Sequence, residues 1–141
     1  MLDFLSFEKT LGHLKKHHNF ALKEQDPELK FAFKTATIQS FENNYEIALK
    51  MLKRVLRDNL SSDEELELMS FKDLIRVAAQ NSLIDDPQSW FGYRNKRNIT
   101  AHTYDENKSE EIFKIMPEFI RDVEILLKKL KDKNVSEQRG E

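Results

Sequence analysis

The residues best suited to chemistry lie in one short stretch, Arg94–Asn107, which reads RNKRNITAHTYDEN. It contains Arg97 and His102 in a chain whose other segments read as amphipathic helix. Arginine stays charged and binds phosphate oxygens with paired hydrogen bonds, whereas histidine titrates near neutrality. The two residues suit metal-independent cleavage of RNA, in which the ribose 2′-OH attacks phosphorus, histidine transfers a proton and arginine stabilises the extra negative charge.

A simpler interpretation applies to the same stretch: the arginine reaches solvent along its own stem and the histidine caps a helix end. On an ideal helix Arg97 shares a face with aromatic and small residues, so its guanidinium needs an acidic partner, solvent, or a place in a cleft or interface. That face comprises Trp90, Tyr93, Arg97, Ala101 and Tyr104. A second, polar face comprises Phe91, Arg94, Asn98, His102 and Asp105.

Arg97 and His102 do not converge on one phosphorus if this helix is continuous. An ideal helix separates them by about 140° around its axis and about 7.5 Å along it. Convergence becomes easier when two copies of the helix face each other across a twofold axis and each supplies an arginine and a histidine. We therefore predict a homodimer with a composite cleft between its protomers.

The remaining histidines are weaker candidates. His13 and His17 are four positions apart, a spacing that can chelate a metal, but a pair is only half of a site. Their neighbours Lys15 and Lys16 favour two partly exposed side chains instead. His18 falls in an apolar stripe and is expected to be buried with a hydrogen-bond partner. A histidine phosphotransfer domain would also be helical, but this turn offers no clear single phospho-acceptor.

Several metal and cofactor chemistries lack their motifs. No histidine follows a glutamate by three positions, as a carboxylate di-metal bundle requires, and neither a glycine-rich phosphate loop nor a nucleophile elbow is present. The lack of cysteine excludes disulfides, thiolate metal sites and cysteine nucleophiles, and it fits a reducing compartment. We predict no metal and no cofactor.

The composition predicts a helical, cytoplasmic protein. A chain of 141 residues with three Gly, three Pro and ten Phe is typical of one all-helical domain. The N-terminal MLDFLSFEKT lacks the regions of a signal peptide, and no apolar run approaches about 18 residues, so no membrane contact is expected. The formal charge of -2 argues against a protein that coats duplex DNA, although a small basic site is compatible with it.

Helical periodicity predicts five helices, and a start signal opens each of the last four. The first two cover residues 3–25 and 27–60, the third runs from about 70 to 84, the fourth starts at 87 and carries the candidate stretch, and the fifth starts near 107. The start signals are Asp26-Pro27, Ser70 with Asp73, Asp86-Pro87, and Asn107 with Glu110.

Two segments depart from this pattern. Residues 61–70, SSDEELELMS, are predicted to form a loop or a short acidic turn, and Pro117 is expected to kink the fifth helix. Short connections then predict an all-α fold, an antiparallel up-and-down four-helix bundle with one additional short helix, which dimerises through the region of the candidate stretch. We expect one domain over residues 1–133 and a polar, disordered tail over 134–141.

The candidate stretch also carries a resemblance to a known superfamily. The run Arg97-Asn98-Ile99-Thr100-Ala101-His102-Thr103-Tyr104 matches the R-x4-H-x-Y form of the motif that marks HEPN proteins. The preceding FKDLIRVAAQNSLIDDPQSWFGYRNKRN resembles the HepT-like nucleotidyltransferase substrate-binding proteins, which are encoded beside a minimal nucleotidyltransferase. The resemblance covers roughly Phe4 to Leu130, and its specific part is Trp90–Glu106.

The resemblance implies a dimeric helical bundle with the motif helices at a cleft between the protomers. It implies a metal-independent endoribonuclease in which Arg97 and His102 are catalytic, while Asn98 and Arg94 give polar and phosphate-binding support. In the toxin–antitoxin branch, a minimal (MntA-like) nucleotidyltransferase partner transfers AMP to the motif tyrosine, here Tyr104. The added bulk and negative charge beside Arg97 would exclude RNA.

The same resemblance leaves two alternatives open. In one, the protein is a non-catalytic subunit that binds nucleotide or substrate for its nucleotidyltransferase partner. In the other, the arginine and histidine bind RNA or nucleotide without turnover. The presence of Arg97, His102 and Tyr104 together favours the nuclease, because a scaffold has no evident need for all three.

Overall fold

The computed structural model describes residues 3–58, 63–102 and 105–138, and this part of the chain is helical with no strand. The all-α prediction is confirmed. The helices are α1 (Leu5–Lys23), α2 (Pro27–Arg57), α3 (Asp63–Leu68), α4 (Phe71–Gln80), α5 (Pro87–Asn98), the 3-10 turn η1 (Thr100–His102), α6 (Glu106–Lys114) and α7 (Met116–Gln138).

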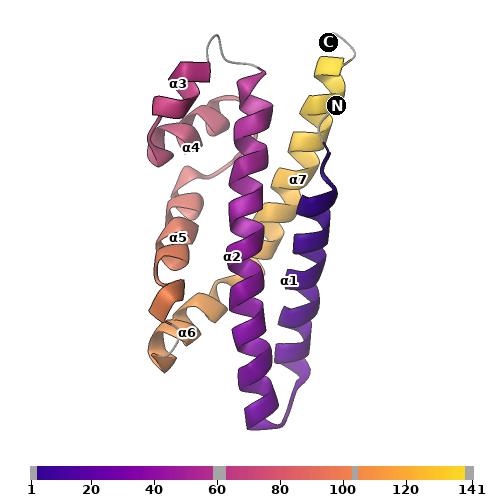
Figure 1. Ribbon diagram of the computed structural model, residues 1–141, viewed down its shortest axis with the longest axis vertical. Helices are drawn as coiled ribbons and strands as arrows, with labels where there is room; N and C mark the ends of the chain where they lie inside the picture. Colours follow the sequence, from indigo (N-terminus) through magenta and orange to yellow (C-terminus); the bar gives the residue numbers. More distant parts are fainter. Residues whose placement is uncertain (1–2, 59–62, 103–104, 139–141) are drawn as a thin grey trace.

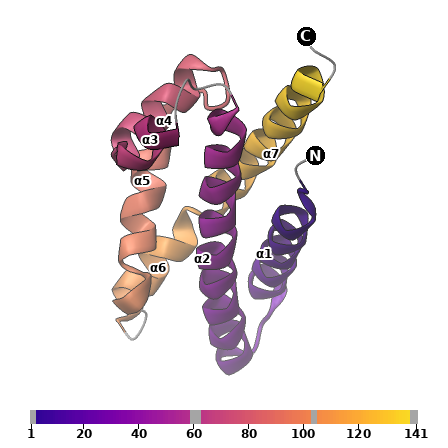
Figure 2. The same cartoon turned by 45° about the horizontal axis from the view of Figure 1, so that its top comes forward.

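Helix α2 is the central element of the molecule. Its 31 residues span about 46 Å at 1.5 Å per residue. Figure 1 shows α1 and α7 on one side of α2 and the shorter α3, α4, α5 and α6 on the other. The chain descends through α1, rises through α2, descends through α5 and rises again through α7, and both termini lie at the same end (Figures 1 and 2).

Aspartate and serine caps set three helix starts where the sequence predicts them. The Asp26 carboxylate accepts a hydrogen bond from the Leu29 N–H, the Ser70 hydroxyl from the Asp73 N–H, and the Asp86 carboxylate from the Gln88 N–H. These caps satisfy N–H groups that have no partner inside their helix. Proline at the first helical position reinforces two of them.

Two predicted segments differ from the structure. Residues 63–68 of the acidic segment form the short helix α3, where the sequence predicts a loop or a short acidic turn. The fifth predicted helix is divided into α6, which Asp105 caps, and α7, because Pro117 lacks the N–H that would continue the ladder. The bundle therefore has more short helices than the single extra one predicted. Helix α7 runs to Gln138, past the residue 133 at which the sequence places the domain end.

An aromatic cluster packs α5 against α2 and α7. The ring of Phe119 on α7 packs edge-on against Phe41 of α2 at 4.8 Å between centroids, and against Tyr93 of α5 at 5.0 Å. Trp90 of α5 meets the same phenylalanine at 6.1 Å. All four side chains are buried, so they fix the position of α5, the helix that carries the candidate stretch.

No helix among the described residues is long and apolar enough to cross a membrane.

Candidate functional site

Helix α5 presents Arg97 toward α2, where Glu42 and Glu46 pair with it. Trp90 and Tyr93 bury one face of α5, and the Tyr93 hydroxyl donates a hydrogen bond to the Asp122 carboxylate of α7. With that face anchored, the C-terminal half of α5 carries Arg94 and Arg97, whose charges act on Tyr45, a buried residue of α2. Burial raises the Tyr45 pKa to about 12, and the positive charges of both arginines oppose that rise. Both guanidinium groups are therefore close enough to Tyr45 to influence its pKa.

Glu46 of α2 holds the Arg97 side chain. The Arg97 Nη2 atom lies 2.5 Å from Glu46 Oε1, and Nη1 lies 3.8 Å from a Glu42 oxygen. Nη1 also donates a hydrogen bond of 3.2 Å to the Thr100 hydroxyl. The hydrogen bond to Glu46 raises the Arg97 pKa, and the side chain remains 30% exposed. Arg97 therefore has both an acidic partner and contact with solvent. These are two of the three environments that the sequence predicts for it.

Arg94 has a different environment. Its guanidinium carbon lies 4.5 Å from the centroid of the Phe71 ring at the start of α4, in a cation–π arrangement. The ring covers one side of the guanidinium plane, while Arg94 as a whole is exposed. Asn98, the last residue of α5, is exposed as well. Both predicted supporting residues are therefore accessible beside Arg97.

The α-helix ends at Asn98, so the prediction of one helix continuing through Tyr104 is wrong. Ile99 leaves the helix and Thr100 begins η1, where the Thr100 hydroxyl donates to the Arg97 carbonyl oxygen at 2.8 Å. A threonine hydroxyl that satisfies a backbone carbonyl competes with the helical ladder. The ideal-helix angle between Arg97 and His102 consequently does not apply.

His102 ends η1 and is half-buried. Its N–H donates to the Ile99 carbonyl at 3.0 Å, and its own carbonyl accepts from the Asp105 N–H at 3.0 Å. His102 is thus the last residue of η1 and lies shortly before the start of α6. Tyr104, the predicted AMP acceptor, lies outside the described residues.

A groove adjoins the two arginines. It has a volume of about 410 Å³ and is lined by Tyr45, Glu46, Leu49, Lys50, Lys53, Met69, Phe71 and Leu74. Sequence reasoning did not identify any of these residues as part of a site. Tyr45 belongs to the apolar stripe of α2, and Glu46, Lys50 and Lys53 look like an ordinary solvated helix face. Only the packing of α4 and α5 against α2 distinguishes them.

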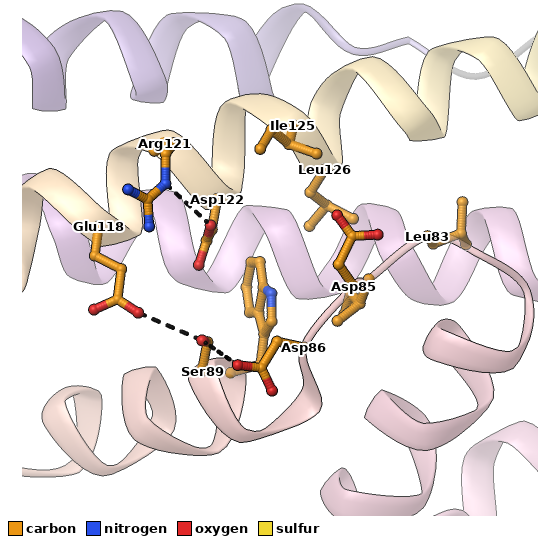
Figure 3. A pocket seen from close by; sticks show the side chains of 11 residues that line it. Leu83, Asp85, Asp86, Ser89, Glu118, Arg121, Asp122, Ile125 and Leu126 are labelled. Carbon is orange, nitrogen blue, oxygen red and sulfur yellow. Dashed lines mark hydrogen bonds and ion pairs between the residues drawn. The ribbon is translucent and has the colours of Figure 1, made fainter.

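A second cavity lies at the other end of α5 and is acidic. It has a volume of about 290 Å³ between the start of α5 and α7. Figure 3 shows Ser89 between two carboxylates: its hydroxyl is 3.0 Å from Asp86 and 3.4 Å from Glu118. Asp122 lies 3.7 Å from Arg121 and accepts the Tyr93 hydrogen bond. These carboxylates are engaged in contacts that join α5 to α7.

The other histidines do not assemble a site. The rings of His13 and His17 stack at 6.3 Å, and His17 Nδ1 is hydrogen-bonded to Ser40 Oγ at 2.6 Å. No group of three metal-binding side chains occurs among the described residues. His18 is buried against Phe113, but its Nε2 atom lacks the hydrogen-bond partner that was expected, and burial lowers its pKa.

Comparisons with known proteins find relatives over most of the chain. Residues 2–132 match the family described as nucleotidyltransferase substrate binding protein like. A Haemophilus influenzae protein named Probable ribonuclease HepT is 33% identical over 131 residues, which cover 93% of this chain and 88% of that protein.

Two solved structures share the fold. One, from Haemophilus influenzae, is described as the fold of a substrate binding domain of a nucleotidyltransferase; it is 33% identical with a TM-score of 0.74 and covers 91% of this chain and 93% of its own. The other, from Thermus thermophilus, is 32% identical with a TM-score of 0.70. The match covers 88% of this chain and 98% of the Thermus thermophilus chain.

Proposed function

The chain belongs to the family of nucleotidyltransferase substrate-binding-like proteins, and on this premise we propose that it is the HepT-like member of a toxin–antitoxin pair. Its activity is that of a metal-independent endoribonuclease. Arg97 and His102 carry out the reaction at a cleft between two protomers, with Arg94 and Asn98 in support. A minimal nucleotidyltransferase silences the enzyme by transferring AMP to Tyr104.

The observation that supports this proposal best is the pair of arginines beside Tyr45. Arg97 is oriented by Glu46 and Thr100 yet partly exposed, and a guanidinium has five N–H donors, so N–H groups remain for a phosphate. Arg94 adds a second positive charge on the same side of α2. His102 lies at the end of η1, and an imidazole can accept or donate a proton in catalysis.

The reaction follows from these groups. A histidine removes the proton of the ribose 2′-OH, the 2′ oxygen forms a bond to phosphorus, and the bond from phosphorus to the 5′ oxygen breaks. A second histidine, from the other protomer, protonates the leaving oxygen, so the products are a cyclic 2′,3′-phosphate and a 5′-hydroxyl. Arg97 neutralises the charge that accumulates on the phosphate oxygens in the transition state.

Silencing is a separate group transfer. The Tyr104 oxygen attacks the α-phosphorus of a nucleoside triphosphate, a bond to AMP forms, and pyrophosphate leaves. The new phosphate places negative charge close to the arginines, which repels the RNA backbone and occupies its place. The proton of the tyrosine hydroxyl is released to solvent.

A cleavage assay tests the nuclease. Purified protein should cut a single-stranded RNA in EDTA, and His102→Ala should lower the rate by about 10²–10⁴-fold, as the loss of acid–base catalysis predicts. His13→Ala is the matched control, because it removes an exposed histidine far along the chain on α1. Absence of cleavage by the unmodified wild type, or equal rates for both variants, would overturn the proposal.

Co-expression with the nucleotidyltransferase tests the silencing. Intact mass should show added AMP on the wild type and none on Tyr104→Phe, and the modified protein should not cleave RNA.

Sedimentation tests the dimer. At micromolar concentration it should show a dimer, and a monomer would contradict the composite cleft.

A second candidate function is a non-catalytic substrate-binding subunit. It is favoured by the description of the Haemophilus influenzae structure as a substrate binding domain of a nucleotidyltransferase. Under this function the arginines bind the phosphates of a nucleotide or RNA without cleavage. A stable complex with the nucleotidyltransferase, together with binding but no products in the assay above, would select it.

A further inference from the structure

The groove beside the arginines has a role that the reaction above does not use. Two of its lining residues connect it to the proposed site: Glu46 holds Arg97, and Phe71 lies under Arg94. A ligand bound at Arg97 that extends along α2 would therefore pass directly into the groove.

The polar rim of the groove is positively charged. Lys50 and Lys53 are exposed and form no ion pair with the acidic side chains described in residues 3–58, 66–102 and 105–134. Other lysines of the chain do pair, for example Lys34 with Glu110 and Lys129 with Asp85. Because Lys50 and Lys53 are three positions apart on α2, their ammonium groups lie on the same side of the helix.

The floor of the groove is apolar and aromatic. Leu49, Met69, Phe71 and Leu74 line it, and the guanidinium plane of Arg94 lies on the Phe71 ring. Unpaired nucleic-acid bases stack on aromatic rings and on guanidinium planes, while lysines bind the backbone that connects them. The groove thus combines the two features that a single strand requires.

We propose that this groove binds the unpaired nucleotide next to the phosphate held by Arg97. Its base packs against Phe71, the ring that also meets Arg94, and its backbone phosphates contact Lys50 and Lys53. This inference rests on the proposed function and narrows it, because it makes the substrate single-stranded RNA. A base within an A-form duplex is stacked on both faces and cannot enter the groove.

Binding of an uncleavable strand tests the groove separately from the chemistry. The probe is a fluorescein-labelled 2′-O-methyl oligonucleotide, which lacks the nucleophile, and anisotropy is measured over a range of salt concentrations. Lys50→Ala with Lys53→Ala should weaken binding and reduce the slope of log affinity against log salt by about 1.4, or about 0.7 for each phosphate that no longer meets a lysine. The control is Lys9→Ala with Lys128→Ala, an equal charge loss at two lysines outside the groove.

A second variant addresses the aromatic floor. Phe71→Leu should weaken binding of the single strand by at least about fivefold, with the thermal unfolding midpoint measured to verify folding. The same sequence annealed to its complement should bind more weakly than the single strand to wild type, and Phe71→Leu should not affect that residual binding.

The outcomes separate the two proposals. If the Lys50 and Lys53 variant binds as the Lys9 and Lys128 control does, the groove inference is overturned, whatever the cleavage assay shows. If the groove variants lose binding while wild type cleaves no RNA, the groove stands and the nuclease proposal fails. Equal affinity of wild type for single strand and duplex would also overturn the groove inference.

Discussion

Glu46 and Arg97 are 51 positions apart in the chain, and their side chains meet at 2.5 Å between Oε1 and Nη2. This contact links the long helix α2 to the end of α5 and orients the guanidinium proposed to bind phosphate. Because Glu46 is largely exposed and Arg97 partly so, the pair adds little to stability, about 0–1 kcal/mol. Its main effect is to orient the Arg97 guanidinium and to place a negative charge beside it.

Glu46→Gln should tighten the binding of RNA. The glutamine oxygen still accepts a hydrogen bond from Arg97, so orientation is kept, while the negative charge that competes with phosphate is removed. We expect KM for RNA to fall by roughly fivefold at low salt, corresponding to about 1 kcal/mol. Glu124→Gln, which removes a carboxylate paired with Lys15, should leave KM unchanged. A rise in KM for Glu46→Gln would contradict this role.

His18 should make stability fall in acid. Burial lowers its pKa in the folded state below the usual value of about 6.5, so below that pH the unfolded chain takes up a proton that the folded chain does not. The contribution of His18 to the free energy of unfolding is therefore complete above about pH 6.5, and it declines as the pH falls below the pKa of His18 in the unfolded chain. Urea unfolding from pH 7.5 to 5 should show wild type losing free energy of unfolding relative to His18→Leu. A difference that is constant with pH would refute the prediction.

Tyr93→Phe should destabilise the contact between α5 and α7. It removes the hydrogen bond from the Tyr93 hydroxyl to the Asp122 carboxylate, which is mostly buried. A hydrogen bond to a charged group contributes about 1.5–3 kcal/mol, so we expect a loss toward the lower end of that range in urea unfolding. Tyr45→Phe is the matched control, because no hydrogen bond of the Tyr45 hydroxyl occurs within the described part of the chain. Equal losses would show that the Asp122 contact is not the cause.

The same hydrogen bond has a spectroscopic consequence. Burial, followed by the hydrogen bond to Asp122, raises the Tyr93 pKa far above its ordinary value of 10. Absorbance titration of the folded protein to pH 11 should therefore show Tyr93 still protonated. The signal lost in Tyr93→Phe should appear only when the protein unfolds, and ionisation of this residue below pH 10.5 in the folded state would contradict the assignment.

Phe119→Ala should be strongly destabilising. The ring contacts Phe41, Trp90 and Tyr93, so its loss opens a cavity where α2, α5 and α7 meet. Removal of a buried phenylalanine costs about 3–5 kcal/mol. Ile125→Ala on the same helix removes a side chain that is 41% exposed and should change the unfolding free energy by well under half of that amount. Similar losses in denaturant unfolding would mean that the aromatic cluster is not the centre of the core.

The sequence by itself determined the helical class, the starts of α2, α4 and α5, and the stretch that carries the candidate residues. These features are local. A cap such as Asp26 or Ser70 bonds an N–H two or three positions along the chain, and apolar spacing identifies a helix without reference to its neighbours. At Pro117 the sequence predicts a kink from the missing N–H, and the structure has a division into α6 and α7 there.

The end of α5 was predicted less well, because the α-helix and the 3-10 turn differ little in free energy at this position. The spacing of Arg97, Ala101 and Tyr104 continues a helical face, and neither Gly nor Pro marks a stop. The Thr100 hydroxyl nevertheless bonds the Arg97 carbonyl and favours the 3-10 turn. A few tenths of a kcal/mol decide such ends, and periodicity does not resolve them.

Only the tertiary structure decided what surrounds Arg97. Glu46, Lys50 and Phe71 come from segments whose sequence patterns describe a solvated face and a helix start, and no spacing rule joins them to α5. They meet because Trp90, Tyr93 and Phe119 fix α5 against α2 and α7, and the positions of helices in a bundle depend on how buried side chains interdigitate. Local patterns thus identify the arginine, whereas packing supplies its partner and the groove beside it.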